Sequence, residues 1–416
     1  MIQQVIHNHT VKNWEQICQW FATKTATLNI PIYSSYDIRD AGYKIACVDG
    51  NIYPAGFNNI CPMDKEGAPE IFERYLKKHY DKKIHKIFLV TEEHTANAYY
   101  WDNVAAIRQI MESCQIQVRI GFAKPMEQNI TVTSATGIQI EVGSAMADSS
   151  WFHEFGADLI VSNNDFSDPK SEWVAGIKLP INPPRELGWY QRQKSRFFKN
   201  YNQLADEFAK IAEIDPFYLR VETEEFLDFD LASDESRAQL AERVDKMIER
   251  LRIAYQARGI QQEPFVFVKN NSGTYGLAVI KVTSGKDVLE WTYKARKKMK
   301  AAKGGRDVSE VIIQEGIPSI VKADNASAEP VIYMIGCELA GGFLRTHIEK
   351  SETESLNSPG AVYKRMCVAD LAVDPAGCPN ENVYGWVAKL SMLAIALEAE
   401  QMKVLFPEFK KISCGK

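Results

Sequence analysis

The chain has 416 residues, with 49 Lys and Arg against 54 Asp and Glu, which gives a formal net charge of −5. Hydrophobic residues make up 45% and charged residues 25%, which is ordinary for a globular protein and excludes a fibrous or disordered chain. The length predicts two or three domains. The acidic balance argues against a protein whose whole surface binds nucleic acid.

We expect no membrane segment and no secretion signal. The first residues, MIQQVIHNHTVKNW, lack the basic start and apolar run of a signal peptide. The apolar stretch 386–405 contains two Lys and two Glu, so it predicts a core helix and not a membrane span. The eight cysteines show no CxxC pair and no zinc spacing, and they predict the reduced thiols of a cytoplasmic protein.

The first half of the chain alternates helical and strand patterns. Short apolar runs predict strands at 44–48, 86–90, 117–122 and 157–161, and helices are expected at 13–29, 69–79 and 102–114. This order predicts a small parallel α/β domain over about 82–185, where ligands bind beyond the carboxyl ends of the strands. Glu92, Glu93 and His94 follow one of these strands directly and are expected at that edge.

The second half has a different pattern. A long amphipathic helix is expected from about 234 to 258, and Gly259 is a natural end for it. Short β segments follow at 265–269, 277–282, 311–314, 331–336 and 342–346. They predict an antiparallel sheet, so the whole chain is expected to combine α+β units with a central nucleotide-binding fold.

Residues 265–282, FVFVKNNSGTYGLAVIKV, combine two strands with a loop of small residues. Such a loop exposes several backbone N–H groups and can hold phosphates, and Lys269 can place an ammonium against the same phosphates. The alternative, equally favoured by this segment alone, is a glycine-containing hairpin turn. The loop residues are Ser272, Gly273, Thr274, Tyr275 and Gly276.

Two further segments carry candidate ligands. VIIQEGI predicts an apolar strand that ends in Gln314 and Glu315; its backbone could seat adenine and its carboxylate could face a metal ion, and the alternative is a plain buried strand. In CVDGNIYPAGFNN, Asp49 and Asn51 stand two apart after a strand and share one side of the pleated backbone. Their oxygens suit Mg²⁺, and the alternative is an ordinary Asp-Gly-Asn turn.

Together these segments resemble the ATP-grasp ligases. The blocks YDIRDAGYKIACVDGNIYPAGFNN, FVKNNSGTYG, VIIQEGIP and GGFLRTH resemble a bacterial family of glutamate–cysteine ligases over roughly residues 30–400. GGFLRTH and the following NSPGA also resemble a stretch of eukaryotic glutathione synthetase, in which the acid-x-Asn metal pair likewise comes early in the chain.

The resemblance implies a mixed α+β and α/β fold of the ATP-grasp type, permuted as in glutathione synthetase, with an inserted small parallel α/β substrate domain. Residues 1–81 would form the N-terminal part of the core with the metal pair. Residues 82–185 would form the substrate domain, and 186–416 the nucleotide-binding region and the C-terminal helix.

The implied activity is that of an ATP-dependent glutamate–cysteine ligase, which forms γ-glutamylcysteine through a γ-glutamyl phosphate in the first step of glutathione biosynthesis. Lys269 and the 272–276 loop would bind the phosphates of ATP, and Gln314 to Ile317 would line the adenine slot. The implied ligands of Mg²⁺, with Mn²⁺ as the alternative ion, are Asp49, Asn51 and Glu315.

Arg345 would act with Lys269 in catalysis, and His347 would approach the phosphates. Glutathione synthetase has Lys at the position of His347 and Glu at that of Asp49. The candidate clamps for a substrate carboxylate are Arg39, Arg185 and Arg345, and the candidate partners of a substrate ammonium are Asp37, Glu92 and Glu93. For any one of these residues, a surface ion pair is the alternative.

Other interpretations stay open. The basic run 294–306 is best explained as a solvated helix face, although a lid over the triphosphate or a nucleic-acid arm fits the same charges. The chain could be another ATP-grasp carboxylate–amine ligase, such as glutathione synthetase, or a non-catalytic nucleotide-binding protein. The expected partners are glutamate, cysteine and ATP, without nucleic acid or membrane, and a homo-oligomer is left open.

Overall fold

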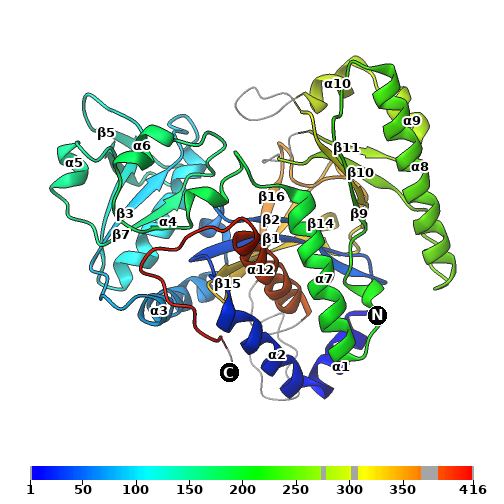
Figure 1. The fold of residues 1–416 in the computed structure, drawn as a ribbon, viewed down its shortest axis with the longest axis horizontal. Helices are drawn as coiled ribbons and strands as arrows, with labels where there is room; N and C mark the ends of the chain where they lie inside the picture. Colours follow the sequence, from blue (N-terminus) through cyan, green and yellow to red (C-terminus); the bar gives the residue numbers. More distant parts are fainter. Residues whose placement is uncertain (1, 273–277, 301–307, 367–382, 415–416) are drawn as a thin grey trace.

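The computed structural model describes residues 2–272, 278–300, 308–366 and 383–414. The described strands form three sheets. Figure 1 shows the cyan and green residues near 90–180 at one end of the molecule and the green and yellow residues near 220–300 at the other. The blue N-terminal strands and the orange C-terminal strands lie between these two ends.

The central sheet joins the two ends of the chain. Its strands run in the order β16-β15-β14-β1-β2, with β13 beside β14, and all its pairs are antiparallel. Because β1 pairs directly with β14, segments from opposite ends of the sequence share one sheet. Its strands are β1 (Tyr33–Asp40), β2 (Ile45–Asn51), β13 (Lys322–Ala323), β14 (Ala326–Ile335), β15 (Glu338–His347) and β16 (Val362–Met366).

A second antiparallel sheet has the order β11-β10-β12-β9. Its buried face packs on the apolar side of a long helix, α8 (Asp234–Gln256), as the periodicity predicted. The strands are β9 (Thr223–Phe226), β10 (Val266–Asn270), β11 (Val279–Val282) and β12 (Val311–Glu315), and the shorter helices are α9 (Gly285–Leu289) and α10 (Tyr293–Met299). The predicted β segments of the second half are therefore confirmed, in two sheets and not one.

The third sheet has the order β5-β6-β4-β3-β7-β8 and is parallel except for the β5–β6 pair. The predicted strands after residue 82 are confirmed here as β3 (Lys86–Thr91), β4 (Gln117–Phe122) and β7 (Leu159–Asn163). The other elements are β5 (Ile130–Thr133), β6 (Gln139–Ser144), β8 (Ile181–Asn182), α3 (Pro62–His79), α4 (Ala98–Ser113), α5 (Ser150–His153) and α6 (Ser171–Gly176).

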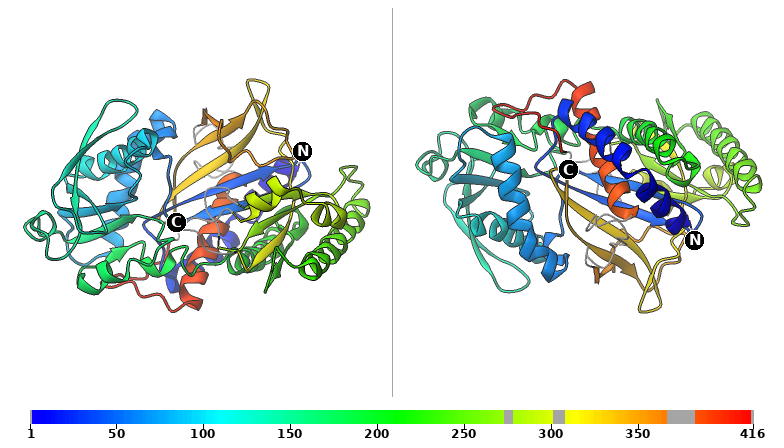
Figure 2. Two further views of the ribbon diagram at one scale, coloured as in Figure 1. Left: turned by 90° about the horizontal axis from the view of Figure 1, so that it is seen from above. Right: turned by 90° about the horizontal axis from the view of Figure 1, so that it is seen from below.

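Four helices pack together beside the central sheet: α1 (Ile2–Lys12), α2 (Trp14–Thr27), α7 (Lys194–Ala212) and α12 (Val383–Gln401). Figure 2 shows the orange-red α12 crossing the blue strands, and α12 contacts β1, β2 and α7. Nearly all residues of α12 are buried, which confirms the predicted core helix. Among the described helices, none combines the length and apolarity needed to span a membrane. The 3₁₀ turns are η1 (Phe57–Asn59), η2 (Arg185–Leu187) and η3 (Pro216–Tyr218).

The prediction that all cysteines are reduced thiols is wrong. Cys337, in the turn between β14 and β15, forms a disulfide with Cys414, and Cys61 is also disulfide-bonded. Cys337 and Cys414 lie 77 positions apart in sequence, with their Cα atoms 6.3 Å apart in the fold. Spacing rules find local cysteine motifs, so they could not find a pair that only the folded chain brings within bridging distance.

Candidate active site

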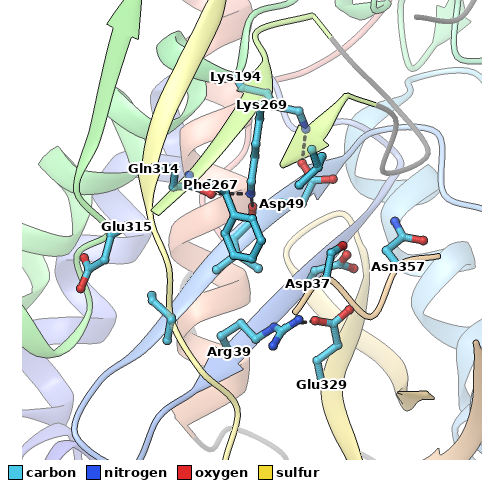
Figure 3. Close-up of a pocket in the computed structure, with 14 residues that line it drawn as sticks. Asp37, Arg39, Asp49, Lys194, Phe267, Lys269, Gln314, Glu315, Glu329 and Asn357 are labelled. Carbon is cyan, nitrogen blue, oxygen red and sulfur yellow. Dashed lines mark hydrogen bonds and ion pairs between the residues drawn. The ribbon is translucent and has the colours of Figure 1, made fainter. Parts of the chain in front are cut away.

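A cavity lies where the central sheet meets the second antiparallel sheet. Figure 3 shows that its charged side chains come from strands of both sheets and from the start of α7. The residues that line it are Asp37, Arg39, Val48, Asp49, Lys194, Phe267, Lys269, Val279, Gln314, Glu315, Ile317, Glu329, Ser355 and Asn357.

A bulge in β2 shapes one wall of this cavity. Asp37 pairs with Asp49 across the two strands, but Ile38 pairs with Cys47, so Val48 is an extra residue in β2. A bulge of this kind bends the strand and changes the direction of nearby side chains. Directly opposed residues of an antiparallel pair share one face of the sheet. The β1–β2 pairing therefore brings the carboxylates of Asp37 and Asp49 together beside the cavity.

Two lysine side chains converge on the Asp49 segment. Lys269 Nζ, from β10, donates hydrogen bonds to Gln314 Oε1 at 2.5 Å and to the Val48 carbonyl at 3.1 Å. Lys194, the first residue of α7, forms an ion pair with the Asp49 carboxylate, as Figure 3 shows. Two ammonium groups fixed beside one cavity are suited to the charge of a polyphosphate.

The pKa values of these groups reflect their shared burial. Burial lowers the pKa of Lys269 to about 8, although the negative charge of Asp49 opposes this effect. Burial raises the pKa of Asp49, but the ammonium groups of Lys194 and Lys269 outweigh it, so this pKa lies below its usual value. Asp49 is therefore a carboxylate at neutral pH, and Lys269 changes its protonation state at a pH slightly above neutral.

A second group of charges forms a buried quartet of two acids and two arginines. Arg345 Nη1 contacts Asp37 at 2.6 Å and Glu329 at 2.7 Å, and Arg39 Nε contacts the other oxygen of Glu329 at 2.6 Å. Burial raises the pKa of Glu329, but the two guanidinium groups lower it by more, so this pKa lies below its usual value. Burial is also the main reason why the pKa of Asp37 is raised, against the opposing charge of Arg345.

Arg39 also supports the rim of the cavity. Its two terminal nitrogens donate to the carbonyls of Glu352 at 3.0 Å and Glu354 at 2.8 Å. The segment that follows carries Ser355 and Asn357, which line the cavity. In this structure the N–H groups of Arg39, a predicted carboxylate clamp, therefore donate to Glu329 and to the backbone of this segment.

Glu315 lines the cavity, but its carboxylate points away from the Lys269 cluster. Figure 3 shows it on the other side of β12 from Gln314, as expected for neighbours on a strand. Its oxygens accept from Lys44 Nζ at 2.6 and 2.7 Å, from Tyr255 Oη at 3.0 Å and from the Glu222 N–H at 3.1 Å. The role of Glu315 as a metal ligand stays a prediction, and it requires Lys44 to leave.

The other predicted nucleotide residues are partly brought together. Gln314 and Ile317 line the cavity with Lys269, whereas Asn51 ends β2 and is not among the lining residues. His347 ends β15, and within the described part of the chain its ring hydrogen-bonds to backbone: Nε2 donates to the Pro359 carbonyl at 3.0 Å and Nδ1 accepts from the Glu349 N–H at 3.2 Å. Ser272 lies in the turn after β10, and Gly273, Thr274, Tyr275 and Gly276 lie outside the described residues.

The predicted residues of the parallel sheet lie at its carboxyl edge and bind their neighbours. Glu93 forms ion pairs of 2.8 Å with both Lys124 and Lys170, and it is not among the cavity residues. Arg185 binds the adjacent Glu186 at 3.1 Å. Glu92, the residue before Glu93, accepts a 2.7 Å hydrogen bond from the N–H of Asp165. The structure therefore does not bring these residues into the cavity of Asp49.

Sequence reasoning missed several cavity residues, of which Lys194 and Glu329 carry the most charge. Neither stands in a recognisable motif, and each contacts a residue from a distant segment of the chain: Lys194 contacts Asp49, and Glu329 contacts Arg39. The basic run gave a clear signal, and its first part is confirmed as helix α10, while residues 301–307 lie outside the described part.

Comparison with known proteins bears on these features directly. The sequence profile of the glutamate–cysteine ligase family, GshA, matches residues 7–399. The chain belongs to this family. A crystal structure of a protein assigned as a γ-glutamylcysteine synthetase from Methylobacillus flagellatus matches with 32% sequence identity and a TM-score of 0.86, over 96% of both chains. The protein is thus an ATP-dependent ligase of glutathione biosynthesis that joins glutamate to cysteine.

More distant solved structures also match. D-alanyl-alanine synthetase A from Vibrio cholerae has 14% identity and a TM-score of 0.32, over 77% of this chain and 82% of that one. An ATP complex of carboxyaminoimidazole ribonucleotide synthase from Aspergillus clavatus has 12% identity and a TM-score of 0.29, over 65% and 59%. Among curated proteins, the comparison found no match.

Proposed function

We propose that the ligase reaction runs in the cavity of Asp49 and proceeds through a γ-glutamyl phosphate. The observation that carries this proposal is the convergence of Lys194 and Lys269 on Asp49, directly opposite Asp37. Transfer of a phosphoryl group to a carboxylate brings two anions together. Fixed positive charge at the meeting point is therefore the main contribution that a protein can make.

The phosphates of ATP would bind at Lys269 and Lys194, together with the 272–276 loop. Gln314 to Ile317 would line the adenine slot, because Gln314 and Ile317 face the same cavity as Lys269. The ring of Phe267 lies beside them, with Lys269 Nζ 5.6 Å from its centre. A planar base and a chain of phosphates would thus find an aromatic wall and two cations in one cavity.

The acidic residues of this cavity fit a divalent ion that enters with the nucleotide. Mg²⁺ is usually held by one or two carboxylates plus substrate phosphates, and it does not need a cage made only of protein ligands. Among the described residues, no three His, Cys, Asp or Glu side chains form such a cage. Asp49 and Asp37 supply two hard carboxylates, and Asn51 ends the same strand. We propose these three ahead of Glu315.

Amino-acid binding would involve the buried quartet of two acids and two arginines, and also the parallel sheet. Arg345 is not itself among the residues that line the cavity, but it contacts Asp37 and Glu329, which do, and it would take part in catalysis from this position. Its Nε is buried and has no hydrogen-bond partner in the described part of the chain. Glu93 and Arg185 would contribute only if the parallel sheet moves toward the cavity, because both are paired locally in this structure.

The chemistry then follows in two steps. A γ-carboxylate oxygen of glutamate bonds to the γ-phosphorus of ATP while the bond to the ADP oxygen breaks. The cysteine amino group next attacks the acyl carbon, phosphate leaves and the nitrogen loses its proton. Lys269, Lys194 and Arg345 would bind the anions and align them; a bound divalent ion would add further charge neutralisation.

The intermediate makes a sharp isotopic prediction. With glutamate labelled by ¹⁸O in its γ-carboxyl group, one labelled oxygen should appear in the released phosphate, measured by ³¹P NMR. Phosphate without label would show that no carboxyl–phosphate bond forms. Omitting cysteine is the control, because release of phosphate should then nearly stop.

We also propose the permuted ATP-grasp arrangement with the three regions 1–81, 82–185 and 186–416. It is supported by the way in which β1 and β2, from the first region, complete a sheet whose other strands come from the last region. The parallel sheet, from Lys86 to Asn182, falls within the middle region and fits an inserted substrate domain. We place the enzyme in the cytoplasm because its reaction consumes ATP.

A further inference from the structure

A buried ion pair lies behind the strand that carries Asp49. Arg192 Nε donates to Glu398 Oε2 at 2.8 Å, and the two side chains are 1% and 0% exposed. Glu398 belongs to α12, and Arg192 lies on the segment that leads into α7. Burying both charges carries a large desolvation cost, so such a pair is weak evidence for a purely stabilising role.

The guanidinium of Arg192 reaches the backbone between the two proposed metal ligands. Its Nη1 donates to the carbonyl of Gly50 at 2.8 Å, and Gly50 separates Asp49 from Asn51. A Cβ atom on Gly50 would lie 2.9 Å from the ring of Phe197, so this peptide fits closely against α7. The Gly50 peptide is thus held both by packing and by a charged hydrogen bond.

The same short segment contacts β2 a second time. Lys194, two residues after Arg192, forms the ion pair with the Asp49 carboxylate. The segment of Arg192 and Lys194 therefore holds β2 at two points, the Gly50 carbonyl and the Asp49 carboxylate.

The carboxylate of Glu398 binds Arg192 through one of its two oxygens. Its second oxygen, Oε1, is buried and has no hydrogen-bond partner in the part of the chain that the structure describes. The aromatic rings of Trp189 and Phe197 flank the guanidinium, with centres 4.7 and 5.4 Å away. Between these rings, the carboxylate of Glu398 determines which way the guanidinium is turned.

We propose that Glu398 and Arg192 are positioning residues for divalent-metal binding. Glu398 on the C-terminal helix fixes Arg192, Arg192 fixes the Gly50 carbonyl, and the fixed peptide directs Asp49 toward the cavity and sets the position of the adjacent Asn51. This inference rests on the proposed metal site at Asp49. It assigns to α12, which supplies no residue to the cavity lining, a role in the affinity for the metal–nucleotide complex.

The test separates positioning from folding by replacing both charges together. In the Arg192→Met/Glu398→Leu double variant no buried charge is left unpaired, so the fold is expected to survive while the contact to Gly50 is lost. Mn²⁺ binding would be measured by electron paramagnetic resonance in the presence of β,γ-methylene ATP, with the melting temperature measured alongside. The dissociation constant for Mn²⁺ should rise about tenfold to a hundredfold, as for other residues that support metal ligands.

Two controls sharpen the result. The double variant Arg74→Met/Glu338→Leu removes an exposed ion pair with matched substitutions and should bind Mn²⁺ as the wild type does. Glu398→Gln keeps an oxygen for Arg192 Nε but leaves the buried guanidinium without a charged partner, so the melting temperature should fall. Its Mn²⁺ affinity, measured well below that temperature, should stay within about threefold of the wild type.

Several outcomes overturn the inference. They are an Arg192→Met/Glu398→Leu variant that does not fold, one that folds and binds Mn²⁺ normally, and a Glu398→Gln variant that loses as much affinity as the double variant. If the wild-type protein binds no Mn²⁺ with the nucleotide analogue, the metal site itself fails, and the inference fails with it. Normal Mn²⁺ binding by the wild type together with unlabelled phosphate in the isotope experiment would overturn the acyl-phosphate proposal alone.

Discussion

The cavity between the antiparallel sheets and the carboxyl edge of the parallel sheet both hold ion pairs, but they hold them differently. At the cavity, Glu329 is 3% exposed and contacts two arginines, one from each strand that pairs with its own. At the parallel sheet, Glu93 is 31% exposed and its partners Lys124 and Lys170 are 44% and 20% exposed. The first group is enclosed by protein, and the second remains in contact with water.

This difference in solvation determines what each charge can do. Water screens an exposed pair, which typically contributes about 0–1 kcal/mol. Removal of one partner of a buried pair leaves a charge without compensation and costs about 3–5 kcal/mol. The buried charges of the cavity would therefore act strongly on a substrate anion that enters it. The exposed side chains at the edge of the parallel sheet can exchange one ion-pair partner for another at little cost in free energy.

The strongest test of this comparison is Asp49→Asn, which keeps the shape of the side chain and removes its charge. We expect kcat/KM to fall by about a thousandfold, since electrostatic groups at a reacting centre commonly contribute 10²–10³ and Asp49 is also a proposed metal ligand. Steady-state ADP formation with glutamate and cysteine would measure the effect. A loss below about tenfold would place the reaction elsewhere in the molecule.

Glu315→Gln distinguishes the sequence-based role of this residue from its observed environment. The variant leaves the Lys44 ammonium, 1% exposed, without a charged partner, so the free energy of unfolding should fall by about 3–5 kcal/mol. The Mg²⁺ concentration for half-maximal activity should stay unchanged. Denaturant unfolding and a Mg²⁺ titration measure the two quantities. A raised Mg²⁺ requirement with normal stability would instead support Glu315 as a metal ligand.

The contrast between Glu315 and Lys269 shows which features of the site could be predicted from the sequence. Apolar runs predicted β10 and β12, and the positions of Lys269 and Gln314 at their ends followed from those strands. The partner of Glu315 did not follow, because Lys44 comes from the other end of the chain and only tertiary packing brings the two together. The same holds for Lys194 and Glu329, whose roles depend on pairing between distant segments and not on local motifs.

The pH dependence of ATP binding tests the buried environment of Lys269. Its pKa is lowered to about 8, so its positive charge is complete well below that pH and is lost as the pH rises through it. Bound phosphates favour the charged form, and KM for ATP should therefore be flat up to about pH 7 and then rise toward tenfold per pH unit. Lys269→Arg keeps its charge throughout this range. Kinetics of this variant should show a flatter profile, and an equally steep one would assign the titration to another group.

The smallest effect is expected at the parallel sheet, with Glu93→Gln. Because Glu93 is partly exposed and bound to two lysines that can turn to water, its loss should change stability by less than about 1 kcal/mol and KM for either amino acid by less than about threefold. KM values for glutamate and cysteine, measured beside the Asp49→Asn variant, give the comparison directly. A large rise in one amino-acid KM with kcat unchanged would mean that Glu93 binds the substrate, as the sequence predicted. The parallel sheet would then have to close over the cavity during turnover, since Glu93 is not among the residues that line it in this structure.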